Sequence, residues 1–303
     1  MKKISLFFIT ALTLSFHSQA IASLNVFACE PEWASLADEL GGERIKSYSA
    51  THALQDPHHI QARPSLIAKV RQADLLICSG ADLEVGWLPL LLRKSGNKQV
   101  RPGNTGYFEA ALAVERLDIP RTLNRSMGDV HAAGNPHVHL DPRRVLIIAK
   151  VFSERLIKLD PQGKNHYLIR YKQFEQRWQQ SIKQWEEKAK PLNGSRIVVH
   201  HRDWVYLFNW LGIKIAGALE PKPGLPTSAS HLMTLKKSLT ENPASMIVFT
   251  PHQNSRGAKR LSSLLNIPAI ELPYTVGGSK RTQDLFALFD EIINTLTEHN
   301  NDQ

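Results

Sequence analysis

Histidines cluster at three places along this chain of 303 residues. The clustered residues are His58 and His59 in "DPHHIQARPS" (56–65), His131, His137 and His139 in "DVHAAGNPHVHLDP" (129–142), and His200 and His201 in "VVHHRDW" (198–204). Neutral imidazole is the commonest protein ligand for zinc, which usually takes four ligands. A single histidine is more often a surface or core residue, so it is the recurrence of the clusters that predicts a metal site.

The segments around the clusters alternate between strand and helix patterns. From 24 to about 120, strand patterns such as "LNVFAC" (24–29) and "ADLLICSG" (73–80) are separated by amphipathic helix patterns, and the alternation resumes from 196 to about 299. Strands separated by helices of this length are typical of βα units in a parallel sheet. The sequence therefore predicts an α/β protein of two lobes, each a mostly parallel sheet flanked by helices.

The middle of the chain has a helical pattern. Asp141 and Pro142 are typical N-cap and N1 residues for a helix that runs to about 159. Aromatic and aliphatic residues then recur every three or four positions between 162 and 190, which predicts one helix roughly 42 Å long. We expect this helix to join the lobes. The expected division is 23–140 for the N-terminal lobe, 141–192 for the helical middle and 193–303 for the C-terminal lobe.

Each histidine cluster falls in a loop or at a strand end. His58 and His59 follow the second strand pattern, His137 and His139 lie between the first lobe and the helical middle, and His201 ends the first strand of the second lobe. Ligands of open α/β folds bind beyond the carboxyl ends of the strands. The clusters are therefore expected to meet in the cleft between the lobes.

Three segments in this order resemble those of a known family. "DPHHIQARPS", "NPHVHLDP" and "HRDWVYLFNWLGI" are similar to the Asp-Pro-His, Pro-His-Val-Trp-Leu-Asp-Pro and His-x-x-aromatic-x-Tyr segments of the zinc and manganese substrate-binding proteins of bacterial ABC transporters, the ZnuA and TroA group. The resemblance covers essentially the whole mature chain. It implies metal ligands at His58, His137 and His201, and a periplasmic protein that captures Zn(II) between its lobes and delivers it to a permease driven by a cytoplasmic ATPase.

The sequence departs from that family at two positions. His139 stands where the family usually has tryptophan, and the segment after the last strand reads "LPYTVGG", without the family's usual carboxylate ligand. The fourth ligand therefore stays open between water and several side chains, namely His131, Asp129, Glu271, Glu220 and His252. A second, weaker site at His59, His131 and His139 also stays open. Three imidazoles favour Zn(II) over Mn(II), which prefers carboxylate oxygen.

The first 22 residues read as a secretory signal peptide. A basic "MKK" precedes an apolar "ISLFFITALTLSF", and Ala20-Ile21-Ala22 forms a small-residue cleavage site. This predicts a soluble periplasmic protein that is not embedded in the membrane. The segment "VFAC" (26–29) faintly resembles a lipoprotein cleavage box that would make Cys29 a lipid anchor, but polar residues end the apolar region well before it.

The net charge and the cysteine content bear on the partners and the compartment of the protein. Removing Lys2 and Lys3 with the signal peptide lowers the formal net charge from +9 to +7, and the remaining basic residues are scattered. No nucleic-acid partner is expected from such a surface. Cys29 and Cys78 both lie at the ends of predicted strands, where either a disulfide or two buried thiols is compatible with an oxidising compartment.

Three other functions compete with metal transport. A zinc-dependent hydrolase would need a general base, for which Glu220 or Asp203 is available, but neither lies in a catalytic motif. A siderophore- or cobalamin-type binding protein would share the two-lobe architecture, yet it would need aromatic or arginine walls rather than imidazoles. An adhesin role does not exclude metal transport. We expect a monomeric binding protein and not an enzyme.

Overall fold

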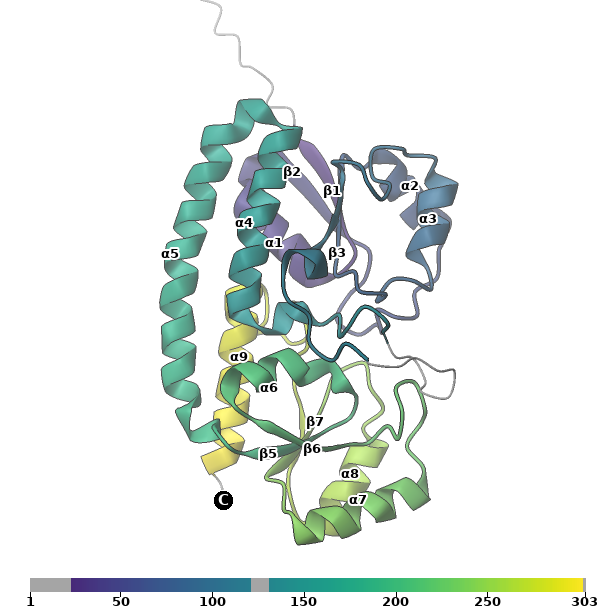
Figure 1. Cartoon of the computed structure of the whole chain (residues 1–303), viewed down its shortest axis with the longest axis vertical. Helices are drawn as coiled ribbons and strands as arrows, with labels where there is room; N and C mark the ends of the chain where they lie inside the picture. Colours follow the sequence, from purple (N-terminus) through teal and green to yellow (C-terminus); the bar gives the residue numbers. More distant parts are fainter. Residues whose placement is uncertain (1–22, 121–130, 302–303) are drawn as a thin grey trace, which may run out of the picture.

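The computed structural model describes residues 23–120 and 131–301, which form two lobes with long helices running beside both (Figure 1). Each lobe holds a four-stranded sheet, with strand orders β2-β1-β3-β4 and β6-β5-β7-β8. All strand pairs in both sheets are parallel. The predicted α/β fold with two parallel sheets is therefore confirmed. The predicted signal peptide and Asp129 lie outside the described residues.

The N-terminal lobe alternates strands and helices. Its elements are β1 (Leu24–Ala28), α1 (Pro31–Gly41), β2 (Ile45–Ser49), α2 (Pro64–Gln72), β3 (Leu75–Cys78), α3 (Leu88–Ser95) and β4 (Tyr107–Glu109). Proline is the first residue of α1 and α2, where its missing N–H has no helical partner to lose. Arg63 is the N-cap of α2, so Ser65, which the sequence places well for capping, lies inside the helix instead.

The C-terminal lobe repeats the same strand order. Its elements are β5 (Arg196–Val199), α6 (Val205–Leu211), β6 (Lys214–Ala218), α7 (Ala229–Glu241), β7 (Met246–Phe249), α8 (Arg256–Leu265), β8 (Ala269–Glu271) and α9 (Leu285–Asn301). The first strand of each lobe is thus an inner strand of its sheet. In each lobe the next strand in sequence, β2 or β6, pairs with one side of this first strand. Loops from the carboxyl ends of these strands run toward the other lobe.

Two helices connect the lobes. Asp141 caps α4 (Pro142–Leu159) by accepting a hydrogen bond from the backbone N of Arg143 at 2.9 Å, as its position before Pro142 predicts. The following helix, α5 (Lys164–Ala189), has 26 residues, or about 39 Å, and runs along both lobes in Figure 1. The predicted long central helix is confirmed.

The aromatic stripe of α5 is a packing face. Trp178 and Trp185 are buried, and the Trp185 ring stacks on Phe289 of α9 with ring centroids 4.9 Å apart. Residues of both lobes and of the helical middle belong to one continuous hydrophobic cluster. Because packed cores deform little, this cluster resists large hinge movements between the lobes.

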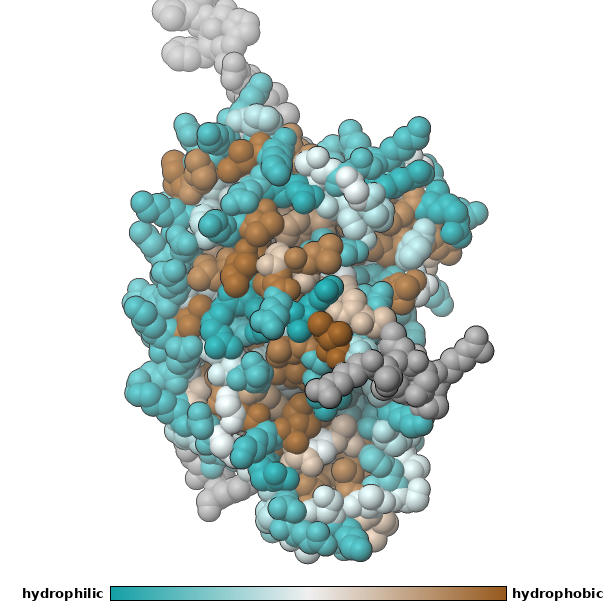
Figure 2. All heavy atoms as spheres, viewed as in Figure 1, coloured by the Kyte–Doolittle hydropathy of each residue, from teal (hydrophilic) through white to brown (hydrophobic). Residues whose placement is uncertain are grey.

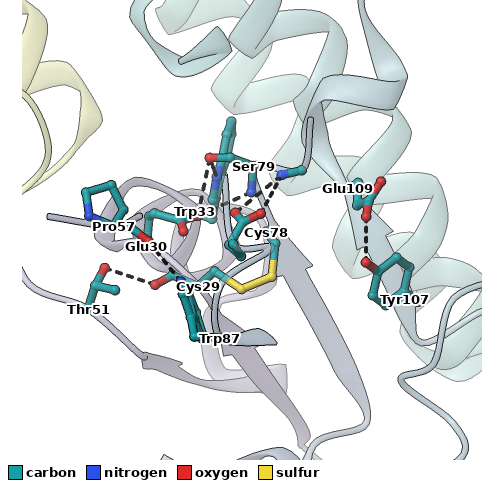
Figure 3. Close-up of a disulfide and its surroundings, with 12 residues drawn as sticks. Cys29, Glu30, Trp33, Thr51, Pro57, Cys78, Ser79, Trp87, Tyr107 and Glu109 are labelled. Atoms are coloured by element: carbon teal, nitrogen blue, oxygen red, sulfur yellow. Dashed lines mark hydrogen bonds between the residues drawn. A yellow bond between two sulfur atoms is a disulfide. The ribbon is translucent and has the colours of Figure 1, made fainter. Parts of the chain in front are cut away.

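A disulfide joins Cys29 and Cys78 (Figure 3). Ala28 of β1 pairs with Ile77 of β3, so Cys29 and Cys78, the next residue on each chain segment, lie beside each other at the carboxyl ends of the two strands. The Cα atoms of the two cysteines are 4.8 Å apart, and both side chains are buried. The sulfur of Cys29 is therefore used within the lobe, which argues against a lipid anchor at this residue.

The exterior is mostly polar. Figure 2 shows hydrophilic side chains over most of one face, with hydrophobic ones in smaller patches between them. Within the described ranges 23–120 and 131–301, no helix has the length and apolar character that crossing a membrane requires.

Candidate metal centre

The structure brings His58, His137 and His201 together between the lobes. One ring nitrogen from each lies within 4.8 Å of those of the other two. His58 lies in the loop after β2, and His201 follows β5 as the N-cap of a short 3-10 helix (Arg202–Trp204). His137 is the N-cap of another 3-10 helix (Val138–Leu140) just before α4. The three imidazoles therefore come from the N-terminal lobe, the C-terminal lobe and the segment between them.

Each of the three rings uses its Nδ1 atom for a contact with a neighbouring oxygen. Nδ1 of His58 lies 2.7 Å from Oδ1 of Asp56, and Nδ1 of His201 lies 2.7 Å from Oε2 of Glu220. Nδ1 of the third ring, His137, lies 2.8 Å from the hydroxyl oxygen of Tyr274. When Nδ1 carries the proton and donates to these oxygens, Nε2 keeps its lone pair.

This arrangement of contacts is typical of metal-binding histidines. A carboxylate or other acceptor on one ring nitrogen sets the tautomer, orients the ring and makes the other nitrogen a better donor to the metal. Nε2 of His137 is buried, with no hydrogen-bond partner among the described residues. Leaving a buried imidazole nitrogen without a hydrogen-bond partner costs free energy. A cation bound to the lone pair of this nitrogen would remove that cost.

His137 is held in its neutral form. Burial lowers its pKa well below the usual value, and the neighbouring rings of His58, His139 and His201 lower the pKa further. An imidazole must be neutral to bind a metal, so this ring is ready to bind at pH 7.

His201 has the opposite protonation state in the metal-free protein. Burial favours a lower pKa, but the charge of Asp203 and the hydrogen bond with Glu220 outweigh burial and raise the pKa of His201 to about 9. In return, although burial favours a higher pKa for Glu220, the hydrogen bond from His201 lowers it. At pH 7 this histidine therefore carries a proton that an arriving cation must displace.

Asn135 links the segments that carry two of the histidines. Its Oδ1 accepts a hydrogen bond from the backbone N of His137 at 3.0 Å, and its Nδ2 donates to the carbonyl of Arg202 at 2.9 Å. The hydroxyl of Tyr206 in α6 donates to the carbonyl of Asn135 at 2.7 Å. These bonds connect the loop before α4 to the C-terminal lobe beside His201.

Two further side chains adjoin the three imidazoles. Nε2 of His131 lies 3.1 Å from Nε2 of His58, and the two rings are stacked with centroids 5.1 Å apart. Oδ1 of Asp203 lies 3.5 Å from Nε2 of His137, while its Oδ2 accepts a hydrogen bond from Gln253 at 2.8 Å. Two nitrogens bound to one tetrahedral zinc ion are roughly 3.3 Å apart, from Zn–N distances near 2.0–2.1 Å. The His58–His131 contact matches this spacing.

The other fourth-ligand candidates lie elsewhere. The carboxylate of Glu220 holds Nδ1 of His201, and His252 lines the open part of the cavity with its ring against Thr250. Glu271 is the last residue of β8, and its side chain is exposed. In place of the carboxylate expected after this strand, the structure places Tyr274 against His137.

The second metal site suggested at His59, His131 and His139 is not assembled. The ring of His139 is buried away from the cavity, with Nδ1 3.2 Å from Oε1 of Glu32 and Nε2 3.1 Å from the carbonyl of Tyr274. His59 is exposed at the cavity rim instead. The cavity itself is polar and is lined by Asp56, His58, His59, His200, His201, Asp203, Glu220, Gly224, His252, Gln253 and Asn254.

Several residues that shape the centre were not singled out as such by sequence reasoning. Asp56 was visible within "DPHH", where an aspartate two residues before a histidine can reach its ring. Asp203 entered only as a possible general base, although it lies two residues after His201. Tyr274 and Asn135 carried no signal, because polar residues of these types are common in loops.

A family model described as "ZnuA: Zinc-uptake complex component A periplasmic" matches residues 26–299. The metal ABC transporter substrate-binding lipoprotein SloC of Streptococcus mutans serotype c is 23% identical over 294 residues, 93% of each chain. The high-affinity zinc uptake system protein ZnuA of Bacillus subtilis is 24% identical over 76% of this chain and 71% of its own. The manganese ABC transporter substrate-binding lipoprotein PsaA of Streptococcus pneumoniae is 24% identical over 83% of this chain and 79% of its own.

Solved structures share the fold. A crystal structure of ZnuA superposes with a TM-score of 0.76 at 17% identity, covering 92% of this chain and 99% of that one. A Mn-bound periplasmic metal binding protein from Candidatus Liberibacter asiaticus gives a TM-score of 0.75 at 14% identity, covering 92% and 100%.

The match extends from the first strand to the last helix, and so includes every segment that contributes to the centre. Substrate-binding proteins of this family are not enzymes, which sets the hydrolase alternative aside. The chain belongs to the ZnuA family of metal ABC transporter substrate-binding proteins.

Proposed function

We propose that this protein captures Zn(II) between its lobes with His58, His137 and His201 and delivers the ion to an ABC permease driven by a cytoplasmic ATPase. The observation that carries the proposal is the shared arrangement of the three rings. Each has Nδ1 engaged by a neighbouring oxygen, which leaves Nε2 as the ring nitrogen that can bind a shared cation once His201 has lost its proton. The ion is cargo and must leave again, which a centre made partly from loops allows.

His131 is proposed as the fourth ligand. Its Nε2 atom already lies 3.1 Å from that of His58, a spacing that suits two ligands of the same tetrahedral ion. Four imidazoles form a ligand set that favours zinc over manganese, because manganese prefers oxygen donors.

A manganese site is the second candidate. The specific observation in its favour is Asp203, whose carboxylate oxygen lies 3.5 Å from Nε2 of His137 and would add an oxygen ligand. Relatives named for manganese transport are as similar to this chain as the one named for zinc uptake. The metal therefore has to be decided by experiment.

Native mass spectrometry of the purified protein before and after chelation tests both candidates. We expect one zinc ion per chain, retained in the presence of excess Mn(II). His131→Ala should weaken zinc binding, whereas Asp203→Asn should weaken it less. Displacement of zinc by manganese, or full zinc affinity in both His58→Ala and His201→Ala, contradicts the proposal.

The place of action proposed for the protein is the periplasm, where it works as a monomer after removal of residues 1–22. The relatives named as lipoproteins act as transporter components, and this chain would differ from them by being soluble. Edman sequencing of the exported protein, with a mass that excludes lipid, tests this. A lipidated cysteine at the new N-terminus would contradict it.

A further inference from the structure

A second group of potential metal ligands lies inside the N-terminal lobe. Sγ of Cys29, Sγ of Cys78 and a carboxylate oxygen of Glu84 lie within 4.8 Å of one another, and all three residues are buried. Cys29 follows β1, Cys78 is the last residue of β3, and Glu84 lies in the loop between β3 and α3. This group shares no residue with the three-histidine centre.

Two carboxyl groups adjoin the disulfide. Glu30 follows Cys29, and its Oε2 accepts hydrogen bonds from the backbone N and Oγ of Ser79 at 3.2 and 3.3 Å (Figure 3). Glu84 accepts from the backbone N of Gly80 at 3.1 Å. Glu30 Oε1 is buried and, among the described residues, receives no hydrogen bond from a backbone or hydroxyl donor.

Burial raises the pKa of both carboxyl groups. Burial, together with the charges of Glu84 and Glu32, raises the pKa of Glu30 well above its usual value. Burial also raises the pKa of Glu84 to about 7.

A disulfide gives no electrostatic reason for two buried carboxyl groups, because its sulfurs carry no charge. Two thiolates with a carboxylate, in contrast, are a familiar set of ligands for zinc, with Zn–S near ~2.3 Å and Zn–O near ~2.0–2.2 Å. The competing explanation is that the two carboxylates only accept hydrogen bonds from Ser79 and Gly80.

We propose that reduction of the Cys29–Cys78 disulfide creates a second metal site, in which the two thiolates and Glu84 hold a zinc-like divalent cation. This inference goes beyond the proposed function and does not depend on it. Formation of the disulfide removes the thiolate donors and releases the ion. The site therefore exists only in the reduced chain.

The redox step balances with a phosphine as the reductant. The phosphine transfers two electrons to the S–S bond, takes the oxygen of one water molecule and becomes a phosphine oxide. The two protons of that water convert the separated sulfurs into thiols. An arriving divalent cation then displaces the two thiol protons, which pass to solvent.

Cobalt(II) is a suitable probe, because thiolate ligands give it a sulfur-to-metal charge-transfer absorption in the near ultraviolet that imidazoles do not give. The test uses the full chain with His58→Ala and His201→Ala, which weaken the three-histidine centre. After phosphine reduction and anaerobic removal of the reductant, we expect one cobalt ion per chain with thiolate absorption. Without reduction, the same chain should give none.

Two variants identify the ligands. Cys29→Ala with Cys78→Ala should abolish the thiolate absorption, and Glu84→Gln, which keeps the size of the side chain, should weaken cobalt binding at least tenfold. The proposal is overturned if the reduced chain retains its near-ultraviolet circular dichroism but shows no thiolate absorption. It is also overturned if Glu84→Gln binds cobalt as tightly as the parent, because the thiolates of an unfolded chain would behave in that way.

Discussion

The hydroxyl oxygen of Tyr274 lies 2.8 Å from Nδ1 of His137, across 137 positions of sequence. Tyr274 belongs to the loop after β8, where the resemblance to the family led us to look for a carboxylate ligand. Burial and the charge of Glu32 raise its pKa well above the usual value, so the phenol keeps its proton. The position therefore supports a ligand histidine and supplies no charge to the metal.

Replacing Tyr274 with phenylalanine tests this supporting role. The variant keeps the buried ring but removes the hydroxyl that contacts Nδ1 of His137. We expect zinc affinity to fall about 10- to 100-fold, the range typical for outer partners of metal-binding histidines. Competition with a chromophoric chelator measures the change. Equal affinity in Tyr274→Phe and the parent would show that the tautomer is set without this hydroxyl.

The carboxylates of Asp56 and Glu220 should strengthen zinc binding through their negative charge. In Asp56→Asn and Glu220→Gln the side-chain oxygen still accepts from Nδ1 of His58 or His201, but the negative charge is lost. We expect about a tenfold loss of zinc affinity for each, measured by the same competition. Glu241→Gln, at the exposed end of α7, is the matched control and should bind zinc like the parent. Losses of equal size in the control would mean that the effect is a general one of net charge.

Zinc binding should strengthen with pH until about pH 9. The raised pKa of His201, about 9, means that this ring is protonated at pH 7 and must lose its proton to bind the ion. Affinity is therefore expected to rise roughly tenfold per pH unit between pH 7 and 9 and then to level off. Calorimetry in buffers of different ionisation enthalpy should show release of about one proton at pH 7. Binding with no proton release at that pH would mean that His201 is already neutral.

Zinc should stabilise the folded chain by mass action. At a free zinc concentration of 100 times Kd, a single site adds about 2.7 kcal/mol to the free energy of unfolding. For a protein of this size that corresponds to a rise in Tm of about 5–10 °C. His137→Ala, measured by scanning calorimetry beside the parent, should lose this rise. A zinc-dependent rise that persists in the variant places the ion elsewhere.

The disulfide should contribute to stability independently of metal. Cys29 and Cys78 are separated by 49 positions, and closing a loop of that length in the unfolded chain is worth about 4 kcal/mol in the chain-entropy account. Cys29→Ala with Cys78→Ala is expected to lower the free energy of unfolding in urea by about that amount. The phosphine-reduced parent provides the comparison, since it loses the cross-link without losing the sulfurs. A double variant as stable as the oxidised parent would contradict the prediction.

The architecture was largely predictable because it follows from local patterns. Alternating strand and helix signals indicated parallel sheets, and the aromatic repeat between Tyr167 and Trp185 indicated a long helix with one buried face. Asp141 before Pro142 marked the start of α4. Such features depend on residues only a few positions apart, whose spacing already determines which face of an element is apolar. Ser65 shows the limit of such local prediction. The helix α2 begins at Pro64, so its N-cap is Arg63, two residues before Ser65.

The metal centre was likewise predictable only in part. By itself the sequence placed the histidine clusters in loops and at strand ends, where they were expected to meet in one cleft, and the resemblance to the family singled out His58, His137 and His201. Only the tertiary structure decided which oxygens hold their Nδ1 atoms, that Tyr274 rather than Glu271 approaches His137, and that Cys29 and Cys78 form a disulfide. Apart from the contact between Asp56 and His58, these contacts join residues 19 to 137 positions apart. Their partners are chosen by sheet register and by the packing of the lobes, which no local pattern of side chains encodes.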